Sequence, residues 1–242
     1  MLAVMSLILS ACWVEAPTLT AQASSTPAPA PVLVEAAVEV PEAVVPAPSV
    51  PLNEMILETL GTYPLGDAIP YFWVRGLHTD GVSQLLQWRG EVLAEPSAKP
   101  GVHCSGITFE VYVRSLLAVR GDEGLSADEM RALKVDWYNE SGGRGGPVDA
   151  LVSRGLGAPI DTLEALEPGD LIQIWRNSGN GHSAVFIDHT RRRSGAIRGL
   201  VFWSAQSSSE GIGYRRVSIG SDIHQLSPGP EGLRGVRAGA AP

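Results

Sequence analysis

The stretch Leu166–Ile187, LEPGDLIQIWRNSGNGHSAVFI, decides the fold that this sequence predicts. Residues 170–176 and 182–188 each hold a short run of large apolar and β-branched side chains, LIQIW in the first and AVFI in the second. Residues 177–181, NSGNG, are a cluster of turn-forming residues between the two runs. Two strand-length runs joined by such a turn predict a β-hairpin.

Strands continue after the hairpin and helices precede it. Residues 199–204 and 213–219 predict a third and a fourth strand, each bounded by turn residues. Upstream, apolar residues at helical spacing predict five helices, over 54–60, 82–94, 105–120, 126–137 and 148–156. Helices followed by an antiparallel meander indicate an α+β fold, with the helices packed on the sheet, and not a doubly wound parallel sheet.

The composition bounds the class of protein. The chain has 242 residues, 44% of them hydrophobic, which is enough for one ordinary domain with appendages. Its formal net charge of −8 argues against nucleic acid as a partner, since a nucleic-acid binder needs a basic surface. Two cysteines exclude a disulfide framework, and no Cys/His ladder indicates a metal site. Nothing in the sequence points to a cofactor.

The domain organisation follows from shifts in composition. Residues 1–12 are nearly all apolar and too few to span a bilayer, so they predict an export signal. Residues 13–52 are rich in Pro and Ala and predict a disordered, extended tether. Residues 53–225 form the predicted globular domain, and residues 226–242, with their Pro and Gly, predict a flexible tail.

The first cysteine ends the apolar segment. Leu9-Ser10-Ala11-Cys12 resembles the lipoprotein box of bacterial signal peptides, although no Lys or Arg precedes it. The resemblance implies that Cys12 is lipidated and that the protein is an exported lipoprotein, anchored to a membrane in the periplasm or cell envelope. An ordinary signal peptide is the alternative, as is a cysteine buried by chance.

The second cysteine has a different setting. Cys104 comes directly before the helix predicted over 105–120, where the helix dipole favours a thiolate. A nucleophilic thiol also needs a base, and His182 at the mouth of the predicted hairpin is the best candidate. The alternative is a buried free cysteine and a surface histidine at a turn.

Three local motifs resemble those of the NlpC/P60 cysteine peptidases, in the order that the family has them. They are His103-Cys104-Ser105-Gly106, Leu166-Glu167-Pro168-Gly169-Asp170-Leu171 and Gly181–Ile187. The related CHAP amidases share the plan and are not separated from NlpC/P60 by these motifs. The resemblance implies a papain-like α+β fold that cleaves peptide or amide bonds of peptidoglycan stem peptides through an acyl-enzyme. It carries Cys104 over as the nucleophile and His182 as the general base and acid.

The remaining site residues are less constrained. A third polar residue should orient the imidazole from the strand after His182, and Gln206 is preferred to Ser204 because its amide oxygen accepts a hydrogen bond. Backbone N–H groups of Ser105 and Gly106, at the helix start, are expected to stabilise the oxyanion. His189 is expected to be a solvated turn residue. The Tyr-Gly-Gly element that NlpC/P60 domains carry before the cysteine is absent from residues 95–102.

The sequence therefore predicts a tethered cell-wall hydrolase. One alternative keeps the fold but makes it an acyltransferase, a transamidase or a toxin-like amidase. The other is a tethered binding module without catalysis. The arginines of 191–193, with Arg215 and Arg216, are expected to lie in solvated turns, with contacts to stem-peptide carboxylates as the alternative.

Overall fold

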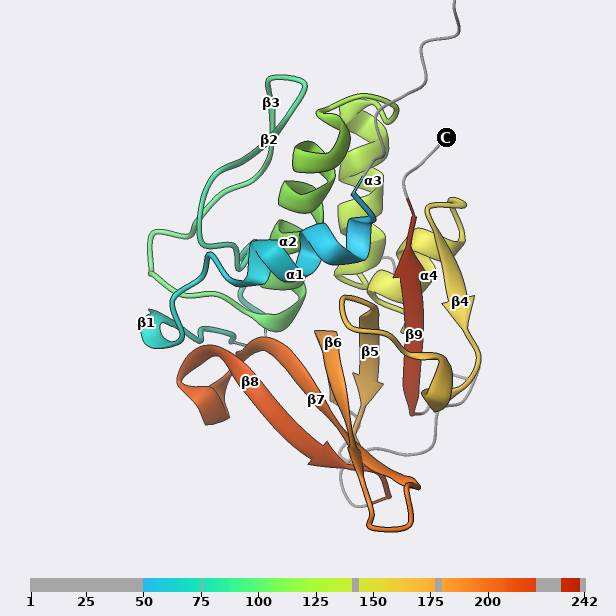
Figure 1. The fold of residues 1–242 in the computed structure, drawn as a ribbon. Helices are drawn as coiled ribbons and strands as arrows, with labels where there is room; N and C mark the ends of the chain where they lie inside the picture. Colours follow the sequence, from blue (N-terminus) through green and yellow to red (C-terminus); the bar gives the residue numbers. More distant parts are fainter. Residues whose placement is uncertain (1–49, 75, 141–143, 177–179, 221–231, 240–242) are drawn as a thin grey trace, which may run out of the picture. The chain divides into compact units, whose positions relative to one another are not determined.

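A large antiparallel sheet, a layer of helices and a separate two-stranded hairpin make up the described part of the chain (Figure 1). The computed structural model describes residues 50–74, 76–140, 144–176, 180–220 and 232–239. A seven-stranded sheet has the order β1-β8-β7-β6-β5-β9-β4, and every pairing in it is antiparallel. Its strands are β1 (Gly66–Pro70), β4 (Gly157–Ile160), β5 (Leu171–Trp175), β6 (Gly181–Arg191), β7 (Ile197–Gln206), β8 (Gly211–Ser218) and β9 (Leu233–Ala238). The predicted α+β class and the β5–β8 meander are confirmed.

Four α-helices accompany the sheet among the described residues. They are α1 (Leu52–Leu60), α2 (Cys104–Arg120), α3 (Ala127–Trp137) and α4 (Pro147–Val152). The central helix α2 packs on β6 and β7, with α1 and α3 beside it. The predicted capping box of α3 is confirmed, since Glu129 N–H donates to Ser126 Oγ and the Glu129 carboxylate accepts from Ser126 N–H. The helices thus cover one face of the sheet, as Figure 1 shows.

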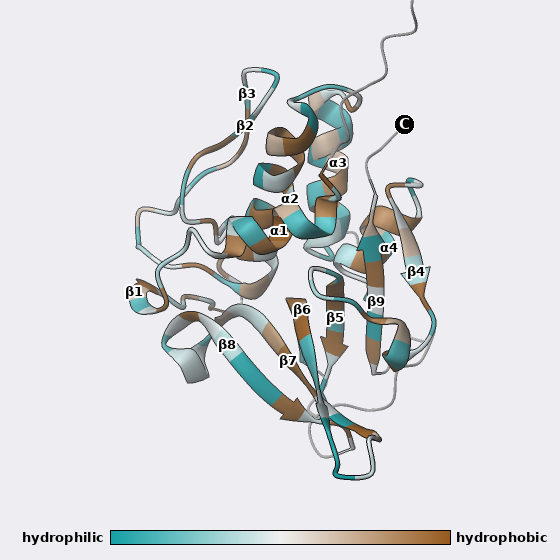
Figure 2. Cartoon of the chain, in the orientation of Figure 1, coloured by the Kyte–Doolittle hydropathy of each residue, from teal (hydrophilic) through white to brown (hydrophobic). Residues whose placement is uncertain are grey.

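Alternation along the strands divides the apolar residues between two faces. Leu171 and Val185 join the main core under the helices, with Trp203 of β7. Ile172 and Phe186 point the other way, into a smaller cluster on the opposite face. Successive side chains of a strand point to opposite faces, so these strands contribute to an apolar cluster on each side of the sheet. Figure 2 shows both teal and brown stretches along β6 and β8.

The helix predicted over 82–94 is wrong. A separate hairpin stands there, made of β2 (Leu86–Trp88) and β3 (Glu91–Ala94). Arg89 and Gly90 join the two strands with φ of 51° and 77°. Positive φ at both central residues is the type I′ turn that matches the twist of a two-residue hairpin. Leu86 and Trp88 are buried while Gln87 is exposed, so the period is two and the apparent helical spacing is accidental.

The flexible tail predicted over 226–242 is also wrong where the structure describes it. Leu233–Ala238 forms β9, which lies inside the sheet between β5 and β4. Arg237 of this strand pairs with the buried carboxylate of Asp170 at 3.1 Å. The sequence of β9, LRGVRA, does not predict a strand, because only Leu233 and Val236 are large and apolar.

The N-terminal predictions concern residues that the structure does not describe. The signal over 1–12 with Cys12, and the tether up to residue 49, lie outside the described residues. At its end the tether prediction is too long, since Leu52 already belongs to α1. Within the described ranges, no helix combines the length and apolar character that a membrane span requires.

Candidate functional site

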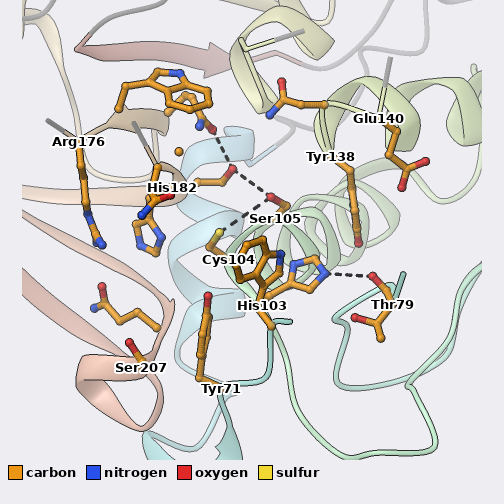
Figure 3. A pocket seen from close by; sticks show the side chains of 18 of the residues that line it. Tyr71, Thr79, His103, Cys104, Ser105, Tyr138, Glu140, Arg176, His182 and Ser207 are labelled. Atoms are coloured by element: carbon orange, nitrogen blue, oxygen red, sulfur yellow. Dashed lines mark hydrogen bonds between the residues drawn. The ribbon is translucent and has the colours of Figure 1, made fainter. Parts of the chain in front are cut away.

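A cavity of about 540 Å³ opens where the N-terminus of α2 meets the ends of β5, β6 and β7 (Figure 3). It brings together Cys104, Ser105, His182 and Gln206, which the sequence analysis selected from places far apart in the chain. The other residues lining it are Tyr71, Trp73, Leu77, His78, Thr79, His103, Tyr138, Asn139, Glu140, Gln173, Trp175, Arg176, Asn180, Gly181, Ser183 and Ser207.

Cys104 is the first residue of α2 and is half-buried with a free thiol. Its Sγ lies 3.9 Å from Ser105 Oγ. The first N–H groups of a helix have no intrahelical acceptor, so the amides of Cys104 and Ser105 are positioned to meet an anion at the helix start. Gly106 is required here, because a Cβ would lie 2.2 Å from the carbonyl oxygen of Gly81. That close approach sets the angle at which the helix enters the site.

His103 caps the helix that carries the thiol. Gly106 N–H donates to His103 Nδ1 at 3.1 Å, and His103 Nε2–H donates to the Thr79 carbonyl at 3.0 Å. Burial lowers the pKa of His103, which keeps this neutral form in place. The expectation that Gly106 N–H serves the oxyanion is therefore wrong, because His103 occupies it. The sequence analysis missed this role, although the position before a helix is where caps are found.

Replacing this cap should cost both stability and site geometry. We expect His103→Ala to lower the free energy of unfolding by about 1 kcal/mol and to slow thiol modification of Cys104, because the first turn of α2 loosens. Urea denaturation and the rate of reaction with a thiol reagent measure the two effects. Ser126→Ala, which removes the cap of α3, is the matched control and should change stability alone. Equal thiol reactivity in both variants would refute the positioning role of His103.

His182, the second residue of β6, lies at the cavity wall and is 5% exposed. Its ring lies 5.5 Å from that of Phe202, and its Nε2 is buried without a hydrogen-bond partner among the described residues. Burial first, then the charges of Arg176 and Arg215, lower the pKa of His182 to about 3. The lowered pKa keeps the imidazole neutral at neutral pH, and no hydrogen bond within the described part joins Cys104 Sγ to this ring.

The buried histidine should also make stability depend on pH. Because its folded pKa of about 3 lies below the unfolded value of about 6.5, the unfolded state binds the extra proton. Stability should therefore fall as the pH drops below about 6.5. Between pH 7 and pH 4, we expect the free energy of unfolding of His182→Gln to fall by about 2–3 kcal/mol less than that of the wild type. Urea denaturation at each pH measures this difference. Equal curves for the His182→Gln and wild-type proteins would contradict the assignment.

Gln206 ends β7 and is 4% exposed. Both polar atoms of its amide are buried without a partner in the described part of the chain. The β6–β7 pairs end at Val185 and Trp203, and beyond them Gln206 pairs with Gly211 of β8 while His182 pairs with Ile174 of β5. Both residues line the cavity, so it holds two side chains with buried polar atoms that have no partner among the described residues.

Ser204, the alternative third residue, has another task. Its Oγ donates to the Ser183 carbonyl at 2.7 Å. Ser183 continues a polar chain that the sequence analysis missed, with its Oγ donating to Gln173 Oε1 at 2.8 Å and lying 3.5 Å from Ser105 Oγ. The signal was present, since Gln173 and Ser183 are polar residues inside otherwise apolar strands.

Tyr71 is a second residue that the sequence analysis missed. It lines the cavity, and an isolated bridge pairs it with Val102 directly before the His103-Cys104 pair. Burial, and then the charge of Cys104, raise the pKa of Tyr71 to about 12, so its hydroxyl stays protonated. The β2–β3 hairpin lies between Tyr71 and Cys104 along the chain, so nothing local in the sequence links the two residues.

Two further residues make contacts away from the cavity. His189 is not a solvated turn residue: it lies on β6, half-buried, with Nε2 2.6 Å from the Leu163 carbonyl. Its ring packs on Phe186 with centroids 4.7 Å apart. Asp170 does more than shape a turn, since it also accepts from Asn53 Nδ2 at 2.7 Å and thereby ties α1 to the sheet.

Comparison with known proteins does not assign the chain to a family. No family model, curated protein or solved structure is significantly similar to the chain. In the parts of the chain that are described, no group of three His, Cys, Asp or Glu side chains is arranged to hold a metal ion. What the site can do chemically follows from its residues: a thiol at a helix N-terminus, a neutral imidazole and an amide share one open cavity.

Proposed function

We propose that the protein is a papain-like cysteine hydrolase of NlpC/P60 or CHAP type that cleaves a peptide or amide bond in peptidoglycan stem peptides. The observation that carries the proposal is the convergence of Cys104 and His182 on one cavity, from the first turn of α2 and the first residues of β6. The resemblance of three sequence motifs to this class supports it independently. The α+β architecture, with a central helix against an antiparallel sheet, is compatible with it.

In the proposed mechanism, His182 takes the proton from Cys104 as Sγ attacks the carbonyl carbon of the substrate. The tetrahedral oxyanion lies at the start of α2, where the N–H groups of Cys104 and Ser105 donate to it. His182 then protonates the leaving amine, and an acyl-enzyme remains on Sγ. Water, deprotonated by His182, releases the acyl group as a carboxylic acid and restores the thiol.

The resting state suits a general base better than a preformed ion pair. Because its pKa is about 3, His182 is neutral at every pH above about 4, and catalytic hydrogen bonds often tighten only when the substrate is bound. Among the described residues neither His182 Nε2 nor the amide of Gln206 has a hydrogen-bond partner, and both side chains line the cavity. A bond from Nε2–H to Gln206 would fix the tautomer and leave Nδ1 for the thiol.

The location belongs to the same proposal. A lipidated Cys12 would anchor the chain to a membrane, and the Pro/Ala-rich segment after it would let the domain reach stem peptides of the cell wall. A lone thiol in an exported domain has no disulfide partner, and Cys104 is the one cysteine left once Cys12 is lipidated.

Digestion of purified peptidoglycan tests the proposal directly. The full-length protein should release new muropeptides, with a free amine and a carboxylate for each bond cut. Products joined to an added amine instead would identify an acyltransferase or transamidase. Binding to peptidoglycan with no new products would identify a tethered binding module, and either result would overturn the hydrolase assignment.

A further inference from the structure

Opposite charges flank the thiol in the cavity. Among its described lining residues, Arg176 is the one guanidinium and Glu140 is the one carboxylate. In the view of Figure 3, Arg176 lies beyond His182 on one side of Cys104, and Glu140 lies beyond Tyr138 on the other. A peptide that crosses Cys104 therefore meets a positive end and a negative end.

The two charged side chains differ in the partners that they have within the protein. Glu140 contacts His78, with 3.3 Å between its Oε1 and His78 Nε2. The side chain of Arg176 has no hydrogen bond or ion pair within the described residues, and its backbone is fixed because Arg176 N–H donates to the Asn180 carbonyl at 3.1 Å. A half-buried guanidinium without a protein partner is a ready site for a carboxylate, which it can bind through two parallel hydrogen bonds.

We infer that Arg176 binds a free carboxylate of the substrate peptide and that this contact selects peptides whose acid is not amidated. The inference rests on the proposed function, since it names what that same site recognises. Glu140 repels the same carboxylate from the other end of the cavity, so the pair also fixes the direction in which the peptide lies across Cys104. The sequence had offered other arginines for contacts with stem-peptide carboxylates, but none of them lines the cavity: Arg191, Arg192, Arg193, Arg215 and Arg216. We therefore assign this contact to Arg176.

Binding to a catalytically silenced protein tests the inference apart from turnover. The full-length Cys104→Ala protein is titrated with alanyl-γ-glutamyl-lysine and with the same tripeptide in which both carboxylates are amides. We expect the acid form to bind about 10- to 100-fold more tightly, the effect of one charge-assisted pair. Adding Arg176→Gln should remove this preference, and adding Arg176→Lys should restore part of it, because a lysine keeps the charge but loses the planar fork.

Arg215→Gln is the matched control. Arg215 also lowers the pKa of His182 but does not line the cavity, so its removal should leave the preference for the acid form intact. Equal binding of the two peptides, no binding of either, or an equal loss of preference in the Arg176→Gln and Arg215→Gln proteins would overturn the inference. Selective binding of the acid form that depends on Arg176, together with no cleavage by the wild type, would instead sink the proposed function and keep the carboxylate site.

Discussion

Cys104→Ala is expected to abolish release of muropeptides by the full-length protein, with a loss of at least about 1000-fold in kcat/KM. The reason is chemical, since no other thiol among the described residues can form the acyl-enzyme. The half-buried side chain loses one sulfur atom at the cavity wall, so the fold should persist. Chromatographic analysis of digested peptidoglycan measures activity, and the circular dichroism melting curve reports on the fold.

His182 supplies the second half of this prediction. His182→Ala should bring activity down to a similar level, and the double variant should be no worse than either single one, because nucleophile and base act as a unit. His78→Gln, at another histidine of the same cavity, is the control and should retain most of the activity. The thiol–imidazole mechanism would be contradicted if the loss of activity in the double variant equalled the product of the two single losses. Turnover that survives in Cys104→Ala would contradict it as well.

Deletion of residues 232–242 is expected to prevent the domain from folding. This deletion removes β9, which pairs with β5 on one side and β4 on the other. It exposes the edge of β5 and takes the fully buried Leu233 and Val236 out of the two apolar clusters. Burying two such side chains stabilises by about 3–6 kcal/mol, which is a large part of the whole stability of a domain this size.

The deletion also removes the ion-pair partner of a buried carboxylate. Asp170 is fully buried, and Arg237 Nε donates to its carboxylate at 3.1 Å. Deletion of residues 240–242 alone is the matched control, since it leaves β9 intact. The truncated proteins are compared by soluble yield and by thermal unfolding. A cooperative transition at the wild-type temperature after loss of 232–242 would show that β9 is dispensable.

Secondary structure was predictable from the sequence wherever the residues that determine it lie within one short segment. The β5–β6 hairpin was predictable because LIQIW and SAVFI alternate between two buried faces and a turn cluster separates them. Helix α3 was predictable because Ser126 and Glu129 close a capping box within a single turn. The β2–β3 hairpin was not, since a type I′ turn at Arg89-Gly90 lies inside a run whose apolar residues also fit a helix.

The sequence by itself determined the α+β class and singled out Cys104 and His182 as candidate site residues, because a cysteine before a helix and a histidine at a strand start are local features. Only the tertiary structure decided what surrounds them. His103 became a cap because Thr79 and Gly106 reach its two ring nitrogens. Tyr71 and Arg176 entered the site because strands distant in sequence end at one cavity. Long-range pairing of this kind, as in the placement of β9 between β5 and β4, depends on packing energies that no short window of sequence contains.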